Sequence, residues 1–237
     1  MTTRPEPSPG ATPLLDVLSQ ESTTGPVSVA SISVALSDGL ASQLVAFTQR
    51  INAPPEIVAM AAWLVTLDRV RGDCTVELGG ATFTVPSGES CTDWLSRLNG
   101  EIKSPSRSSA LSSELDWAND PQRLALRQEE TLLCVALDVN AMALVSAART
   151  PPLSGESVHT LLTSAAYVIE QIVSEPTQAV ASLDVLRPEA RRQLLQEWND
   201  APWSHRGPMD VVSCFEQVVH AHQDHVAVIT PGHADLS

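Results

Sequence analysis

The sequence predicts an α+β fold, because amphipathic helices and short alternating strands follow one another without a regular strand–helix–strand repeat. Two pairs of strands lie close enough in the sequence to form hairpins, which join antiparallel strands. Of the 237 residues, 43% are hydrophobic but only 4% are aromatic, so the core is expected to consist of aliphatic side chains. A chain of this length has room for one large domain or two small ones.

The first structured elements are predicted to be a strand and a helix. The segment SVASISVALS, just after Val27, alternates apolar and polar residues, as a half-buried strand does. Ser37 or Asp38 is then expected to cap a helix from about Gly39 to Ile51, because Ser and Asp accept hydrogen bonds from first-turn amides. The apolar residues of this helix recur at helical spacing, which predicts one buried face.

A second helix, Glu56–Arg71, is expected after the break at Asn52–Pro55, since proline interrupts a helix. Its first three turns are apolar nearly all round, which is typical of a central core helix. The runs Thr75–Leu78 and Ala81–Val85 alternate on either side of Gly79-Gly80, and two glycines suit a tight hairpin turn.

The middle of the chain is predicted to contain a helix, a loop, two strands and a longer helix. The helix begins at Ser90 or Thr92, and the Ser-rich residues 103–122 that follow predict an exposed loop. Residues 130–149 read as two strands around a turn. Ser154 is a candidate cap for the longer helix, which runs to about Val173.

Both ends of the chain differ from this central part. Residues 1–27 are rich in Pro, Ser, Thr and Gly and are expected to be mostly flexible. An extended linker, Ala179–Leu186, is expected before a charged helix, Pro188–Trp198, with Pro188 at the favoured first position. A further helix is predicted to lead into an apolar strand, Val226–Thr230, which has no later partner in the sequence.

The charge of the chain excludes some classes of function. The formal net charge is −14, whereas phosphate binding needs clustered Lys and Arg, so we expect neither nucleic acid nor an anionic membrane as a partner. The N-terminus has no apolar stretch typical of a signal peptide, and no run is long enough to span a bilayer. We therefore expect a cytoplasmic protein.

No catalytic constellation emerges from the motifs, so we predict no catalytic, cofactor-binding or metal-binding residues. Three histidines, His220, His222 and His225, suggest a metal site, but residues two apart on a helix point in nearly opposite directions. The four cysteines lack metal-ligand spacing and are expected to be small buried or half-buried thiols. The chain also contains no G-x-S-x-G elbow, no P-loop and no G-x-G-x-x-G.

The segment Leu183–Ser237 resembles the condensation–adenylation linker of nonribosomal peptide synthetases, followed by the start of an adenylation domain. In the linker the resemblance rests on Leu183, Leu186, Arg191, Leu194, Leu195, Trp198, Asn199 and Asp200. It continues in Phe215-Glu216, Val218, Asp224, Val226-Ala227-Val228 and Leu236-Ser237. Residues 31–72 and 131–174 are similar to the C-terminal lobe of a condensation domain.

The resemblance implies an organisation for the whole chain. It implies a flexible segment (1–27), a condensation-like C-lobe (28–176), a linker (177–208) and an incomplete adenylation domain (209–237). The implied fold of the lobe is half of a chloramphenicol-acetyltransferase-like sandwich. The catalytic His-His-x-x-x-Asp-Gly motif of condensation domains is missing, because the sequence contains no His-His pair.

The implied function is therefore structural: a lobe without catalysis that packs against the downstream adenylation domain. The expected interface residues are Leu186, Arg191, Leu195, Trp198, Asn199 and Phe215. ATP, Mg and phosphopantetheine are implied for the downstream modules but not for this chain. A carrier protein or an upstream synthetase subunit is a further possible partner.

Two alternatives remain open at this point. The lobe would form half of a split condensation domain if another chain supplied the catalytic histidines. Alternatively, residues 1–27 would make the chain a docking module for an upstream carrier or tailoring protein.

Overall fold

The computed structural model describes residues 28–72, 75–78, 81–103, 115–118, 121–124, 132–150, 153–199 and 211–222. Contacts divide the chain into two units, Met1–Pro188 and Glu189–Ser237. The predicted flexible N-terminus and the predicted strand Val226–Thr230 lie outside the described residues. Among the described helices, none is both long enough and apolar enough to cross a membrane.

The first unit contains a four-stranded sheet in the order β1-β6-β5-β4. Its strands are β1 (Ser28–Ala35), β4 (Leu115–Trp117), β5 (Leu133–Asp138) and β6 (Ala143–Thr150). A separate hairpin consists of β2 (Thr75–Leu78) and β3 (Ala81–Thr84). The hairpin and the pairs β1–β6 and β5–β6 are antiparallel, whereas β4 pairs with β5 in parallel. The predicted α+β class is therefore confirmed, with a mixed sheet.

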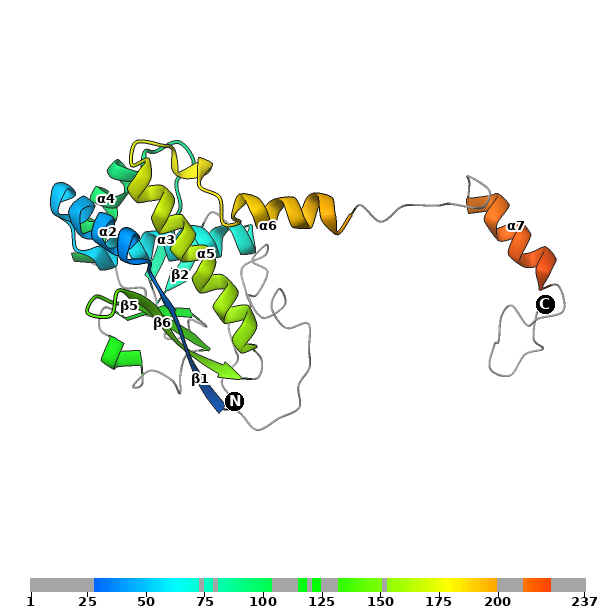
Figure 1. The fold of residues 1–237 in the computed structure, drawn as a ribbon, viewed down its shortest axis with the longest axis horizontal. Coiled ribbons are helices and arrows are strands. Elements are labelled where there is room, and N and C mark those ends of the chain that lie inside the picture. Colours follow the sequence, from blue (N-terminus) through cyan, green and yellow to red (C-terminus); the bar gives the residue numbers. More distant parts are fainter. Residues whose placement is uncertain are drawn as a thin grey trace, which may run out of the picture. The chain divides into compact units, whose positions relative to one another are not determined.

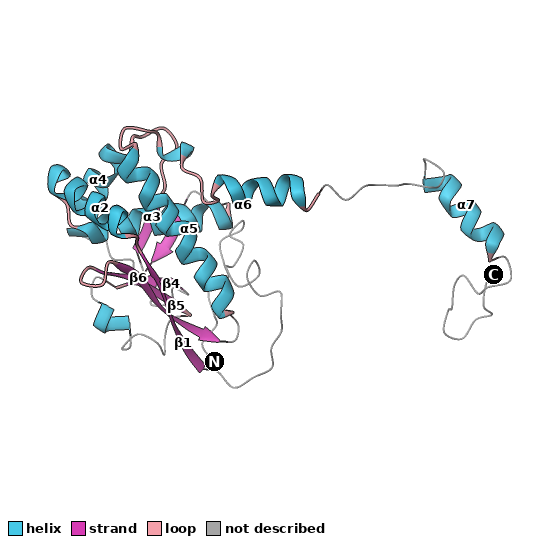
Figure 2. Ribbon diagram, viewed as in Figure 1, coloured by secondary structure: helices cyan, strands magenta, loops and turns pink. Residues whose placement is uncertain are grey.

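Four helices lie on one side of this sheet (Figures 1 and 2). They are α2 (Asp38–Ile51), α3 (Pro55–Arg71), α4 (Cys91–Lys103) and α5 (Gly155–Ser174). The predicted caps are confirmed: the Ser37 hydroxyl accepts from Leu40 N at 3.3 Å and the Ser154 hydroxyl accepts from Ser157 N at 3.0 Å. Asn52, which ends α2, adopts a left-handed conformation with φ 51°, which Asn tolerates better than most residues.

Helix α3 is the centre of the core, as its apolar sequence predicts. All residues from Ile57 to Asp68 are buried, and α3 packs against α5, α4 and β5. Trp63 and Trp94 are the largest fully buried side chains of the described residues. The aliphatic side chains around them make up most of the core, in agreement with the composition.

The predicted exposed loop at 103–122 is wrong at its C-terminal end. Residues 115–118 form β4 and the residue that follows it, and all four are buried. Leu115 pairs with Leu133, and the amide of Ala118 donates to Val135 O at 2.9 Å. The serines upstream dominate the composition of this stretch, whereas the short apolar run Leu115-Asp116-Trp117 determines where the chain adds a strand.

We predict that Trp63→Ala destabilises the protein by about 3–5 kcal/mol, because a buried indole leaves a large cavity when it is removed. Trp63→Phe should cost much less, since the Trp63 indole N–H has no hydrogen-bond partner among the described residues. Urea unfolding followed by circular dichroism measures both variants. Equal losses for Phe and Ala would contradict this account.

Candidate interdomain site

The chain between α5 and the next helix is tightly bound to the first unit. We call residues 175–187 the strap. The predicted extended linker at 179–186 is only partly extended, because Val180–Ser182 form a 3₁₀ turn. Val180 and Leu183 are buried in the main core, and their apolar character explains why the strap packs rather than projecting into solvent.

Backbone groups of the strap cap the N-terminus of α4. The first helical amides have no partner within a helix, so other acceptors must satisfy them. Cys91 N donates to Gln178 O at 3.0 Å and Thr92 N donates to Pro176 O at 3.0 Å. Asp93 N donates to the Ser90 hydroxyl at 3.2 Å, and Ser90 forms an isolated bridge with Ala179. The strap therefore completes α4.

Side chains from α3 and α5 hold the rest of the strap. Arg69 donates to the carbonyls of Val180 and Ala181. The amide of Gln171 makes a two-point contact with Asp184: its Nε2 donates to Asp184 O at 2.7 Å, and its Oε1 accepts from Asp184 N at 3.0 Å. No sequence signal distinguishes Gln171 from the other polar residues of α5, so its role was not predicted.

Arg187, at the end of the strap, contacts α5 in two ways. Its guanidinium donates to the Glu170 carboxylate at 2.7 Å and lies 4.6 Å from the centre of the Tyr167 ring. Both charged side chains are nearly half exposed, so the pair contributes less than about 1 kcal/mol. Together with the cation–π contact to Tyr167, it places Arg187 against α5 at the end of the strap.

The segment after the strap forms α6 (Pro188–Arg192), which continues as a π-helical turn, Gln193–Glu197. Trp198 N donates to Gln193 O at 2.9 Å, and the Asn199 side chain donates to Leu194 O at 2.7 Å. Asn199 therefore satisfies a carbonyl at the end of its own helix. The predicted helix Pro188–Trp198 is confirmed in its extent, with this change of pitch in its second half.

Large apolar side chains, of the kind that are mostly buried in the lobe, are exposed after residue 185. Nine of the twelve exposed large hydrophobic residues of the described chain fall after residue 185: Leu186, Leu194, Leu195, Trp198, Val211, Val212, Phe215, Val218 and Val219. Trp198 is 67% exposed and Leu195 is 61% exposed. Arg191 is exposed as well.

Helix α7 (Val211–Ala221) carries its own exposed stripe. Val211, Val212, Phe215, Val218 and Val219 recur at helical spacing on one face, and Phe215 is 68% exposed. None of the residues of α7 is buried. His220 and His222 lie at its end, and the described residues contain no group of three potential metal ligands. His225 lies outside them.

The cysteines of the described part have different surroundings. Cys91 and Cys134 are buried, whereas Cys214 on α7 is partly exposed. Burial raises the pKa of the Cys91 thiol from 9.0 to about 11, although its backbone hydrogen bond acts in the opposite direction. At neutral pH Cys91 is therefore a packed, neutral thiol. Cys74 lies outside the described residues.

No family model matches the chain. In curated proteins, malformin synthetase mlfA of Aspergillus brasiliensis is 33% identical over 73 residues, which are 31% of this chain and 1% of that protein. The corresponding protein of Aspergillus vadensis is 34% identical over 67 residues, 28% of this chain and 1% of its own length. The chain thus matches about 1% of the length of these relatives.

Two solved structures resemble this chain over about two thirds of its length. The four-domain nonribosomal peptide synthetase holo-AB3403, bound to AMP and glycine, has a TM-score of 0.52 at 10% identity, covering 68% of this chain and 18% of that one. The X-domain from teicoplanin biosynthesis has a TM-score of 0.50 at 12% identity, covering 67% of this chain and 50% of that one. The fold is condensation-domain-like and related to nonribosomal peptide synthetases. The predicted fold class is confirmed.

We predict that Gln171→Ala speeds hydrogen exchange of the Asp184 amide about tenfold, because that amide loses its acceptor and the strap loses its two-point contact. Exchange measured by NMR tests this, with Ser174→Ala on the same helix as the control. Unchanged exchange at Asp184 in Gln171→Ala would show that the contact does not hold the strap.

We predict that Cys91 makes the protein sensitive to alkaline pH. Because the folded pKa lies above the unfolded value, the stability it contributes is complete below pH 9.0 and is lost as the pH rises to about 11. The loss should be about 2–3 kcal/mol. Urea unfolding at pH 8 and pH 11 should show this loss in the natural protein and a smaller one in Cys91→Ala. Parallel pH dependence in both proteins would refute the assignment.

Proposed function

We propose that this chain is a non-catalytic N-terminal interaction region of a nonribosomal peptide synthetase module, active in secondary-metabolite biosynthesis in the cytoplasm. In this proposal it packs against a downstream adenylation domain. Residues 28–176 are the condensation-like C-lobe, 177–208 the linker, and 209–237 the first part of the adenylation domain.

The observation that carries the proposal is the uneven distribution of exposed apolar side chains. Among the described residues of the lobe only Val29, Val45 and Val139 are exposed large apolar residues, whereas Leu194, Leu195 and Trp198 are all exposed on one short helical segment. A large exposed apolar surface on a protein marks a contact with another protein or domain. Trp198 is the expected anchor, because buried indoles dominate many interfaces.

The contacts of the strap are a second observation that supports this proposal. A linker that is bound to α3, α4 and α5 delivers its exit point, Arg187, to a fixed place on the lobe. A domain that follows the linker then begins at a defined position on the lobe. Less conformational entropy is therefore lost when that domain docks. Leu186, which is 38% exposed beside Arg187, is the interface residue on this part of the chain.

The proposal assigns no cofactor to this chain. ATP and Mg belong to the complete adenylation domain and phosphopantetheine to a carrier domain, both downstream. The sequence contains no phosphate-binding loop and no His-His pair, so adenylation and condensation are assigned to other parts of the synthetase. A carrier protein or an upstream subunit is a secondary partner in this scheme.

We predict that Trp198→Ala loosens the lobe from the adenylation domain in a module that contains both. Loss of a central anchor costs about 2 kcal/mol or more, so cleavage between the two domains by a low dose of protease should speed up at least about tenfold. Val139→Ala, which truncates an exposed apolar residue on the lobe, is the matched control and should leave the rate unchanged. An unaltered rate in Trp198→Ala would exclude Trp198 as the anchor.

A further inference from the structure

Strand β1 lies at one edge of the four-stranded sheet. It pairs with β6 along all eight of its residues, from Ser28 opposite Thr150 to Ala35 opposite Ala143. Among the described residues no strand pairs with its other side. Figure 1 shows β1 leading directly into α2. An edge strand of this length offers unpaired backbone groups to another chain.

The register shows which backbone groups face the free side. The amide of Leu36 donates to Met142 O at 2.9 Å, directly after the pair Ala35–Ala143. In an antiparallel ladder the backbone N–H and C=O groups of every second residue bond to the partner strand. The backbone groups of the even-numbered residues of β1 therefore point toward β6. The amides of Val29, Ser31, Ser33 and Ala35 therefore face outward, and the side chains of these four residues are all exposed.

Residues 28–37, SVASISVALS, contain none of the features that usually protect an edge. This stretch has no charged residue, no proline and no glycine. Natural edge strands commonly carry Lys, Pro or a bulge, which oppose pairing with other chains. The opposite edge of the sheet is different, because β4 is only three residues long. β1 is thus the one long, uncharged strand edge among the described residues.

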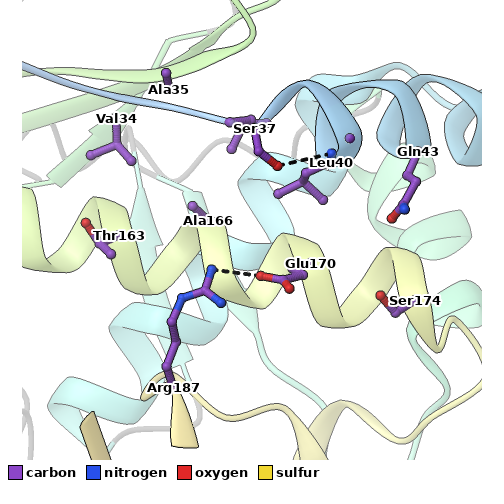
Figure 3. Close-up of a pocket in the computed structure, with 12 residues that line it drawn as sticks. Val34, Ala35, Ser37, Leu40, Gln43, Thr163, Ala166, Glu170, Ser174 and Arg187 are labelled. Carbon is purple, nitrogen blue, oxygen red and sulfur yellow. Dashed lines mark hydrogen bonds and ion pairs between the residues drawn. The ribbon is translucent and has the colours of Figure 1, made fainter. Parts of the chain in front are cut away.

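A cleft of about 600 Å³ adjoins the C-terminal end of this edge. One wall is the chain from Val34 to Leu40, and the other is a stripe of α5 formed by Thr163, Ala166, Glu170 and Ser174. Figure 3 shows Val34 and Ala166 pointing into the space from opposite walls, with the Arg187–Glu170 pair at its rim. Clefts of about 300–1,000 Å³ are typical of ligand sites.

We propose that β1 and this cleft bind an extended peptide segment of a partner protein, which adds a strand to the sheet. Peptides commonly join a sheet at a strand edge that lies beside a groove lined by a helix. Main-chain hydrogen bonds to the edge then provide affinity, and the groove selects every second side chain of the peptide. The inference uses none of the exposed apolar residues after 185, so it does not rest on the proposed function.

The walls define the chemistry of the peptide. Side chains that enter the cleft meet Val34, Leu40 and Ala166, which favour small aliphatic residues. Alternate side chains lie beside the exposed Ser31 and Ser33, which favour hydroxyl or other small polar residues. The net charge of −14 disfavours acidic segments and favours basic ends. The expected ligand is therefore an alternating aliphatic and hydroxyl-bearing peptide with basic flanks.

The first test uses the full chain and a labelled probe peptide, Lys-Thr-Val-Thr-Val-Thr-Val-Lys. NMR hydrogen exchange at saturating peptide should show about tenfold greater protection at the amides of Val29, Ser31, Ser33 and Ala35. The even-numbered amides of β1 should not change, because β6 already binds them. Equal protection at odd and even positions would overturn the proposal, as would no protection at all.

Variants on each wall test the two parts of the site by fluorescence anisotropy. Ser33→Pro removes an outward amide hydrogen and should weaken binding at least about tenfold, whereas Ser33→Ala keeps the amide and should bind within about twofold. Thr163→Arg narrows the cleft from α5 and should weaken binding, with Thr163→Ser as its control. If Ser33→Pro fails to fold, Thr163→Arg and the alternating exchange pattern decide the question.

Other occupants of the edge give distinct results that overturn the proposal. Outward amides that become protected as the concentration of peptide-free protein rises would identify a second copy of the chain. Outward amides that are already protected at the lowest concentration would show that the chain covers its own edge. Equal anisotropy for the natural protein and a folded Ser33→Pro variant would exclude strand addition.

Discussion

The contact between the strap and the N-terminus of α4 is the constraint on which the C-terminal side of the lobe depends. Two of the first amides of α4 donate to carbonyls of residues 176 and 178, which are more than eighty positions later in the sequence. Val180 and Leu183 then bury their side chains in the same core as Trp94 of α4. Removing the strap would leave helix amides unsatisfied and apolar core surface exposed, and both are costly. The strap is therefore a packed part of the lobe, although it also connects the lobe to the helix that follows.

The sequence predicted the local structure of the lobe well because its signals are short-range. Ser37 and Ser154 cap helices through residues three positions away, and the apolar surface of α3 requires burial on all sides. The π-helical turn at Gln193–Glu197 had no such signal, since it depends on how Trp198 and Asn199 bond back to carbonyls in the same turn. The strand at Leu115–Trp117 was missed because its pairing with Leu133–Val135 is parallel and long-range. The three residues Leu115-Asp116-Trp117, at the end of a Ser-rich stretch, do not indicate that they pair with the strand at Leu133–Val135.

The site was predictable in one respect and not in another. The exposed apolar residues after 185 stand out in the sequence as matches to a family pattern, and the structure places Leu195, Trp198 and Phe215 at the surface. Their use as an interface stays a prediction. The two-point contact of Gln171 with Asp184 and the free edge of β1 were invisible, because each depends on which segment lies beside another. Periodicity identifies a strand and its faces, but it does not say whether the strand has a neighbour on both sides.

The physical state of α7 gives an independent reason to expect a partner for the C-terminal segment. An isolated helix shorter than about 12–15 residues is marginal in water, and most helices in proteins are stabilised by burial of an apolar face. α7 has eleven residues, a regular apolar face and no buried residue among those described. Full burial of a side chain such as Phe215 contributes about 1.5–3 kcal/mol, so covering this face would offset much of the entropy cost of ordering the helix. Burial of this apolar face would therefore stabilise α7, and in our proposal the adenylation domain provides the surface that covers it.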